Sequence, residues 1–142
     1  SILLREMYER TLINQQTVIL DGTLSKYDKA KENIIRSLKR QRKVFIFYVY
    51  QKPEVAWQFT LAREKVEGRN IPKDVFVNQF IQVRETACRI QDEFKERISI
   101  FLVKKDYQTN KVESVNFIQS HNQGLDAHLP DRYTREQITK LL

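Results

Sequence analysis

The sequence contains a single cysteine, Cys88, so no disulfide can form within the chain. A lone cysteine is typical of a reducing compartment, and we therefore expect a cytoplasmic protein. The longest apolar run, "VFIFYVY", has the length of a strand and is too short to cross a membrane. The opening residues "SILLREMYER" also lack the charged-then-apolar pattern of a secretory signal. These absences argue against a membrane-spanning or exported protein.

Basic residues outnumber acidic ones, with 25 Lys and Arg against 18 Asp and Glu, which gives a net charge of +7. That balance suggests anionic partners such as nucleotides, nucleic acid or phosphorylated sugars. The densest basic segment covers residues 25–43, in which Ile34, Ile35 and Leu38 share one helical face. Its charges are therefore either the solvated side of a helix over 26–41, which we favour, or a nucleic-acid surface.

Three apolar, β-branched runs predict strands near residues 17–21, 43–50 and 97–104. The middle run is apolar without a break, which is typical of a strand covered on both faces. After the third run, a turn near Asn110 would return the chain as a C-terminal hairpin. Strands separated by long crossovers indicate a mostly parallel α/β sheet.

Helical spacing of apolar residues predicts the segments between these strands. The expected helices cover residues 2–14, 26–41, 53–68 and 73–97. A last short helix should follow Thr134, which forms a capping box with Gln137. No repeat or domain boundary interrupts the pattern, so we expect one α/β unit over residues 1–142.

Asp21 stands at the end of the apolar run in "TVILDGT", where Gly22 and Thr23 follow it. A carboxylate at this place resembles a Walker B element, which orients Mg²⁺ beside phosphates. Ligands of open α/β sheets also gather at the carboxyl ends of strands, where the Thr23 hydroxyl could contact a substrate oxygen. Taken alone, the same residues are better explained as an ordinary turn after a strand.

Arg63 and Arg69 flank the expected helix end at Gly68. A helix and loop carrying arginines can close over a nucleotide and neutralise charge on a transferred phosphoryl group. Both arginines could instead pair with Glu64, Glu67 or Asp74 in solvent. Spacing alone leaves the two interpretations equal.

Other chemistry-bearing residues carry weaker patterns. The loop near the C-terminus contains two histidines and two aspartates, but their spacing fits no strong zinc pattern. These residues are His121, Asp126, His128 and Asp131.

Several further side chains are better explained by packing than by chemistry. Cys88 lies on the apolar face of its helix, which favours a core residue over a nucleophile. Trp57, Phe59 and Phe80 are likewise expected to pack and not to form a base-stacking platform.

The order of these motifs resembles the later half of zeta-toxin family kinases. "LDGTL", then a strand, then "KPEVAW…TLAREKVEGRNIPKDVF" are similar to that family's acidic-Gly-Thr strand end, Pro-Glu-aliphatic-Ala helix start, helix arginine and Gly-Arg-x-x-Pro lid. The resemblance covers residues 17 to about 105. It implies part of a P-loop-kinase fold, ATP and Mg²⁺ as cofactors, UDP-N-acetylglucosamine as phosphoryl acceptor and an antitoxin protein as partner.

Roles carry over from the resemblance to four positions of this sequence. Asp21 would be a catalytic residue near magnesium and substrate, and Thr23 would contact the substrate. Arg63 and Arg69 would bind the ATP phosphates and take part in catalysis.

The sequence departs from the family because it contains no G-x-x-x-x-G-K-[ST] loop to cradle phosphates. Its three glycines, Gly22, Gly68 and Gly124, have no spacing that could form one. The family's catalytic Asp after that loop has no counterpart either. We therefore expect the C-terminal portion of a kinase domain, inactive by itself. The alternative is a non-catalytic basic module that binds nucleic acid or an antitoxin-like protein.

This departure has a consequence for the sheet. In P-loop kinases the strand before the phosphate loop lies between the strands that match 17–21 and 43–50. Without it both strands would have unpaired edges. We expect direct pairing of these two strands, a rearranged sheet, or a strand supplied by another chain.

Overall fold

The computed structural model describes residues 17–20, 24–119 and 124–142. In chain order the elements are β1 (Thr17–Leu20), α2 (Tyr27–Lys39), β2 (Val44–Tyr50), α3 (Pro53–Glu67), α4 (Lys73–Phe94), η2 (Lys95–Arg97), β3 (Ser99–Lys105), β4 (Val112–Ile118), η3 (Leu125–His128) and α5 (Arg135–Leu141). The helix expected over 2–14 lies outside the described residues. None of the helices in the described ranges is long and apolar enough to cross a membrane.

The four strands form one sheet in the order β1-β2-β3-β4. β1, β2 and β3 run parallel, and β4 pairs antiparallel with β3. A turn joins β3 to β4, and in it Asn110 has φ 59°. The mostly parallel α/β fold and the C-terminal hairpin are therefore as the sequence predicts.

β1 pairs directly with β2, from Thr17 opposite Val44 to Leu20 opposite Phe47. Of the three arrangements expected for a sheet without a phosphate-loop strand, the structure has direct pairing. Unpaired backbone groups on parallel strands are costly, so two neighbouring strands that lack a central partner gain by pairing with each other.

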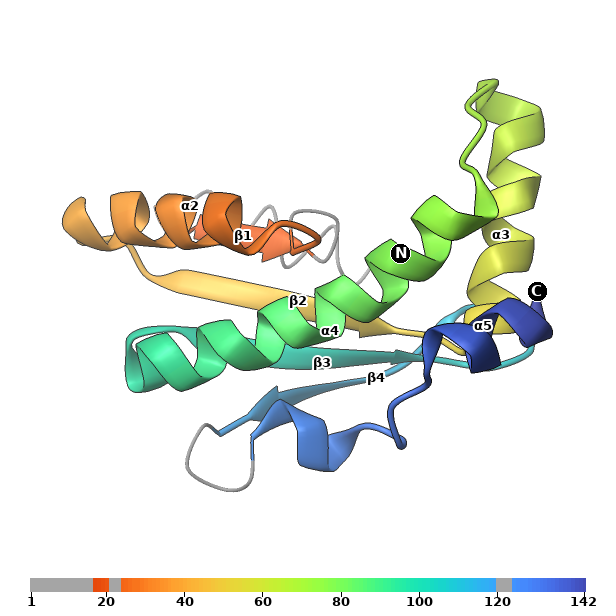
Figure 1. Ribbon diagram of the computed structural model, residues 1–142. Helices are drawn as coiled ribbons and strands as arrows, with labels where there is room; N and C mark the ends of the chain where they lie inside the picture. Colours follow the sequence, from red (N-terminus) through yellow and green to blue (C-terminus); the bar gives the residue numbers. More distant parts are fainter. Residues whose placement is uncertain (1–16, 21–23, 120–123) are drawn as a thin grey trace.

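Helices α2 and α4 cover one face of the sheet (Figure 1). Alternate residues of a strand point to opposite faces. The helix-covered face of β2 therefore presents Val44, Ile46, Tyr48 and Tyr50, which belong to the main core with Ile90 of α4. The crossovers between parallel strands carry these helices, as expected for βαβ units.

The opposite face of the sheet is also apolar. Phe47 of β2 stacks on Phe101 of β3 with ring centroids 5.2 Å apart, and Phe117 of β4 follows at 5.5 Å from Phe101. Phe47 is buried, whereas Phe117 is 53% exposed. Apolar residues on both faces explain why the β2 sequence shows no polar alternation.

Local sequence signals fix the helix ends that shape the cleft described below. Pro53 is the first residue of α3, where its missing N–H is not needed. Gly68 ends that helix with φ 72°, a left-handed conformation that glycine adopts without a steric penalty. Thr134 and Gln137 form the predicted capping box at the start of α5.

Candidate functional site

A cleft of about 490 Å³ opens at the carboxyl ends of β2 and β3. Its walls come from α3 and α4, and its floor from the last residues of β2. Lys105 at the end of β3 and Ser25 before α2 also line it. This edge of a parallel sheet is where α/β proteins bind ligands, and the volume suits a molecule of nucleotide size.

The lining of the cleft is aromatic and positively charged. Arg63 and Lys105 supply two cations, and none of the described residues on its walls is acidic. The amide side chains of Gln79 and Asn110 supply donors and acceptors. Its aromatic residues are Tyr48, Tyr50, Phe59, Phe76 and Phe80. Aromatic rings beside cations and amides suit an anionic ligand that contains a planar ring.

Gln51 holds the β3–β4 turn against the end of β2. Its Nε2 donates to the Asp106 carbonyl oxygen at 2.7 Å and to Asn110 Oδ1 at 3.1 Å. Its Oε1 accepts from the Lys52 backbone N–H at 2.7 Å, so both ends of the buried amide are bonded. The turn that carries Asn110 is therefore fixed at the mouth of the cleft.

The turn is also fixed from within. Asp106 Oδ1 accepts from the backbone N–H groups of Gln108 and Thr109 at 2.9 and 2.8 Å. These bonds, with a further one from the Thr109 hydroxyl, hold the pKa of the Asp106 carboxyl below its usual value. A carboxylate that closes its own turn in this way is typical of Asp in tight loops.

The structure places one of the two predicted arginines at the cleft. Arg63 lines the cleft from α3, and its side chain is 75% exposed. Its only described ion-pair partner is Glu67, at 3.8 Å, a long contact between exposed groups that contributes little. Arg69 follows the helix end at Gly68 and is exposed, but it does not line the cleft.

Asp21 and Thr23 lie outside the described residues. The residues on either side of them are described: Leu20 ends β1, and Ser25 lines the cleft. Their predicted roles toward magnesium and substrate therefore stay predictions.

Sequence reasoning missed three residues of the cleft, Gln51, Lys105 and Asn110. The signal for the first two was their position directly at the ends of predicted parallel strands. Asn110 was assigned only as a turn. Phe59, expected to pack, is 38% exposed and lines the cleft, whereas Trp57 is buried against Phe76 as expected.

Asp126, one of the two aspartates of the candidate metal loop, pairs with two arginines. Asp126 Oδ1 accepts from Arg84 Nε at 2.8 Å, and Asp126 Oδ2 lies 3.3 Å from Arg132 Nη2. His128 Nδ1 lies 3.0 Å from the Gly124 carbonyl oxygen. No group of three metal-ligating side chains occurs among the described residues, and His121 lies outside them.

Cys88 packs against the core, as the sequence predicts. Burial raises the pKa of its thiol, and the nearby Asp126 carboxylate raises it further. A thiol held protonated is a poor nucleophile, so the cysteine has the character of a packing residue.

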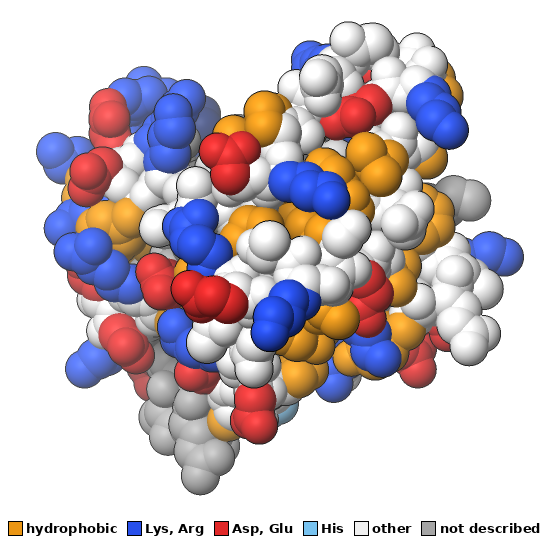
Figure 2. Space-filling view, turned by 45° about the vertical axis from the view of Figure 1, so that its right-hand side comes forward, with side chains coloured by type: hydrophobic (Ala, Val, Ile, Leu, Met, Phe, Trp, Pro, Cys, Tyr) orange, Lys and Arg blue, Asp and Glu red, His pale blue; other side chains and the backbone are white. Residues whose placement is uncertain are grey.

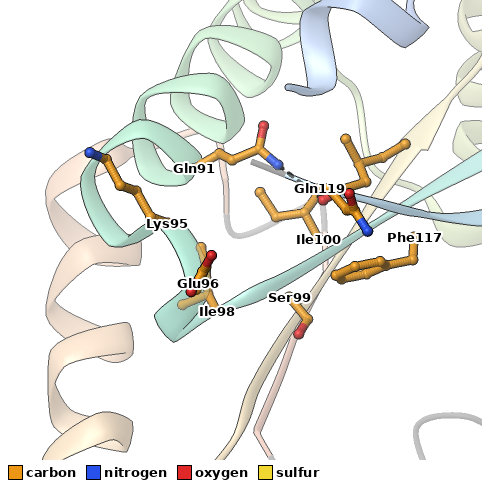
Figure 3. A pocket seen from close by; sticks show the side chains of 9 residues that line it. Gln91, Lys95, Glu96, Ile98, Ser99, Ile100, Phe117 and Gln119 are labelled. Carbon is orange, nitrogen blue, oxygen red and sulfur yellow. Dashed lines mark hydrogen bonds between the residues drawn. The ribbon is translucent and has the colours of Figure 1, made fainter. Parts of the chain in front are cut away.

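A smaller pocket of about 160 Å³ lies at the other end of β3, where α4 ends (Figure 3). The Gln91 amide beside it is already bonded, because its Nε2 donates to the Ile118 carbonyl and its Oε1 accepts from the Leu125 N–H. The Lys95 ammonium points away from the other labelled side chains in the view. No charged groups converge there, so the larger cleft is the candidate site.

The basic segment forms helix α2 and the loop after it. Ala30, Ile34 and Ser37 are its buried residues, and the charges lie on the opposite, solvated side. Lys31 pairs with Glu93 at 2.6 Å and Arg36 with Glu32 at 2.9 Å. Figure 2 shows Lys and Arg gathered on the left of the view, with acidic side chains among them.

The fold and the cleft define a mostly parallel α/β protein with a basic, aromatic site at the carboxyl edge of its sheet. A comparison with protein families shows that the family model described as Zeta toxin matches residues 1–123. The chain therefore belongs to the zeta toxin family, a family of kinase-like toxins. No curated protein matches the chain. Helix α5 lies beyond the matched region.

Proposed function

We propose that this chain is the substrate and lid half of a zeta-toxin-type kinase, which transfers the ATP γ-phosphate to a nucleotide sugar such as UDP-N-acetylglucosamine. The composition of the cleft carries the proposal. Two cations, five aromatic rings and several amides line it, and no acidic side chain does among the described residues. A nucleotide sugar offers a planar base, a diphosphate and hydroxyl groups to such a surface.

Arg63 is the described residue with the clearest role. Its guanidinium is free to reorient, because its one described ion pair is long and exposed. It can therefore turn toward a phosphate in the cleft. Arg69 lies beyond the end of α3 at Gly68. It would also reach a phosphate in the cleft if the loop after α3 closes. Asp21 and Thr23 complete the proposed set, near magnesium and at the substrate respectively.

The chain by itself does not fit ATP with Mg²⁺. The 142 residues contain no phosphate-binding glycine loop, and the described residues contain no cluster of metal-ligating side chains. We therefore assign the chain to substrate binding and charge neutralisation, and expect no phosphoryl transfer from it alone. A P-loop segment would have to complete the site.

Calorimetric titration of the chain with UDP-N-acetylglucosamine tests the binding role. We expect weak binding, and Arg63→Ala should raise the Kd about tenfold because one charge-assisted contact is lost. Lys65→Ala is the matched control, since it removes an exposed cation from the same helix outside the cleft. No binding, or an equal loss in both variants, would overturn the assignment of the cleft.

Phosphorus NMR of ATP, Mg²⁺ and the nucleotide sugar tests transfer. This chain should show no turnover. A longer gene product that contains a P-loop should show turnover that Arg69→Ala removes. A longer product with an intact P-loop but no turnover would exclude the kinase and leave a binding module.

The second candidate is a basic surface for nucleic acid or an acidic antitoxin-like protein. Four exposed basic residues at the end of α2 favour it: Lys39, Arg40, Arg42 and Lys43. Binding to nucleic acid through them should weaken steeply as salt concentration rises. An affinity for oligonucleotides that does not change with salt would exclude this function.

A further inference from the structure

Helix α3, which carries Arg63, is contacted at its base by both α5 and α4. The backbone of α5 lies close to that of α3. Figure 1 shows α5 across the base of α3, while the far end of α3 projects away from the sheet. The only described aromatic contact between α3 and α4 is that of Trp57 with Phe76.

α5 is itself firmly anchored on α4. Ile138 is fully buried and lies beside Phe80 and Arg84 of α4. Arg135 of α5 donates to the Asn78 side chain, and Lys73 Nζ donates to the carbonyl oxygen of Leu142 at 3.4 Å. The capping box closes the first turn of the helix. The buried Ile138 therefore supplies the main contact of α5 with α4, and the exposed hydrogen bonds at its two ends add to it.

The segment before α5 is tied to the same helix by an ion pair. Arg84 is about nine-tenths buried on α4, and its Nε donates to Asp126 Oδ1 at 2.8 Å. Arg132, two residues before the helix cap at Thr134, binds the other oxygen of Asp126. Residues 125–142 therefore run along α4 from the ion pair to the base of α3.

The two ends of α3 differ in burial. Pro53 and Trp57 near its start are buried, whereas Val66 near its end is 86% exposed. The start of α3 is therefore its best-buried part, and the helix extends from it toward the exposed end. Any movement at the base is carried to the cleft wall and to Arg63.

We propose that residues 125–142 are a positioning clasp for α3, with Ile138 as its central residue. By holding the base of α3, the clasp sets where Arg63 stands relative to the cleft. The clasp lies beyond residue 123, where the family match ends. The clasp stands on packing alone, and only its consequence for Arg63 rests on the proposed function.

Hydrogen exchange of the full chain tests the clasp. In Ile138→Ala, protection of the α3 amides should fall about tenfold while protection in β2 and β3 is kept, because the cavity loosens the α5 contact locally. Lys140→Ala, an exposed change on α5, should leave all protection unchanged. Loss of protection in α5 with α3 unaffected would overturn the clasp.

Global destabilisation by the alanine is controlled with Ile138→Val, which removes less of the buried side chain. If the clasp exists, Ile138→Val should cause a smaller loss of amide protection than Ile138→Ala, and only in α3 and α5. An equal loss across β2, β3 and α3 in both variants would show that Ile138 is only a core residue.

A second measurement separates this inference from the proposed function. If the cleft binds UDP-N-acetylglucosamine, Ile138→Val should raise the Kd in wild-type background and add little to Arg63→Ala. Additive effects would contradict positioning through Arg63. If no nucleotide sugar binds, the exchange experiment still decides whether the clasp exists.

Discussion

The rings of Trp57 and Phe76 lie with their centroids 5.1 Å apart and their planes at 58°, and they join the base of α3 to α4. Phe76 continues to Phe80 at 6.1 Å, and Phe80 to Tyr50 of β2 at 6.4 Å. Aromatic contacts thus run from the arginine-bearing helix to the sheet. The geometry of the cleft depends on this row of rings as much as on the clasp.

Trp57→Ala should therefore lower the free energy of unfolding by about 3–5 kcal/mol, because it leaves a large cavity beside Phe76. Urea denaturation followed by circular dichroism measures it without the tryptophan signal. Val66→Ala, on the exposed end of α3, should change the value by less than about 0.5 kcal/mol. Similar losses in both variants would show that α3 is not anchored through its base.

Tyr50 gives a prediction at alkaline pH. Burial, followed by the neighbouring Tyr133 and Tyr107, raises the pKa of Tyr50 to about 12. In the unfolded chain a tyrosine ionises near pH 10. Between these values the unfolded state has lost a proton that the folded state keeps, so stability should fall as pH rises from 10 toward 12.

Tyr50→Phe should remove this alkaline loss. The Tyr50 hydroxyl is buried without a hydrogen-bond partner among the described residues, so the substitution should cost less than about 1 kcal/mol at neutral pH. Stability measured by urea denaturation from neutral to alkaline pH checks both points. A loss above about 2 kcal/mol at neutral pH would mean that the hydroxyl has a partner.

Asp126 gives the opposite prediction in acid. Burial by itself raises the pKa of this carboxyl, but the hydrogen bond and charge of Arg84, with Arg132, outweigh it and leave the pKa below its usual value. Its contribution is then present above pH about 4 and is lost as pH falls through the lower folded pKa. Asp126→Asn should cost about 1–2 kcal/mol at pH 7 and flatten the acid part of the profile. An unchanged acid profile would contradict the ion pair.

Much of this fold could be predicted from the sequence, because its signals are local. The apolar runs gave the strands, Gly68 and Pro72 the boundary between α3 and α4, and Thr134 with Gln137 the start of α5. For β1 and β2 the sequence left three arrangements open, of which the structure has direct pairing. The side-chain pattern could not choose among them, because the choice depends on backbone pairing.

The candidate site was harder to predict. Motif order singled out Arg63, which lines the cleft. Gln51 and Asn110, in contrast, come together across 59 positions of sequence through one hydrogen bond. The role of α5 depends on its contact with α3, which no local pattern reports. Periodicity identifies an apolar face without showing which element covers it.

The Gln91 amide provides a further test, because it joins α4 to both β4 and the start of the clasp. Its Nε2 donates to the Ile118 carbonyl at 3.2 Å and its Oε1 accepts from the Leu125 N–H at 2.8 Å. Gln91→Leu leaves two buried backbone groups without these partners and should cost about 1–3 kcal/mol. Gln79→Leu, an exposed change on the same helix, should stay within about 0.5 kcal/mol in the same urea titration. If Gln91→Leu lowered stability as little as Gln79→Leu does, the Ile118 carbonyl and the Leu125 N–H would not depend on the Gln91 amide.

Gly68 tests how the helix end sets the approach to Arg69. Its φ of 72° favours glycine, and an added Cβ would meet no atom within 4 Å, so backbone strain is the whole cost of a substitution. Gly68→Ala should therefore destabilise by about 1 kcal/mol, and Gly68→Asn by less, because asparagine tolerates the left-handed region better. Urea titration of both variants measures the difference. An alanine variant as stable as wild type would mean that α3 can end in another conformation, and Arg69 would then have no fixed starting position relative to the cleft.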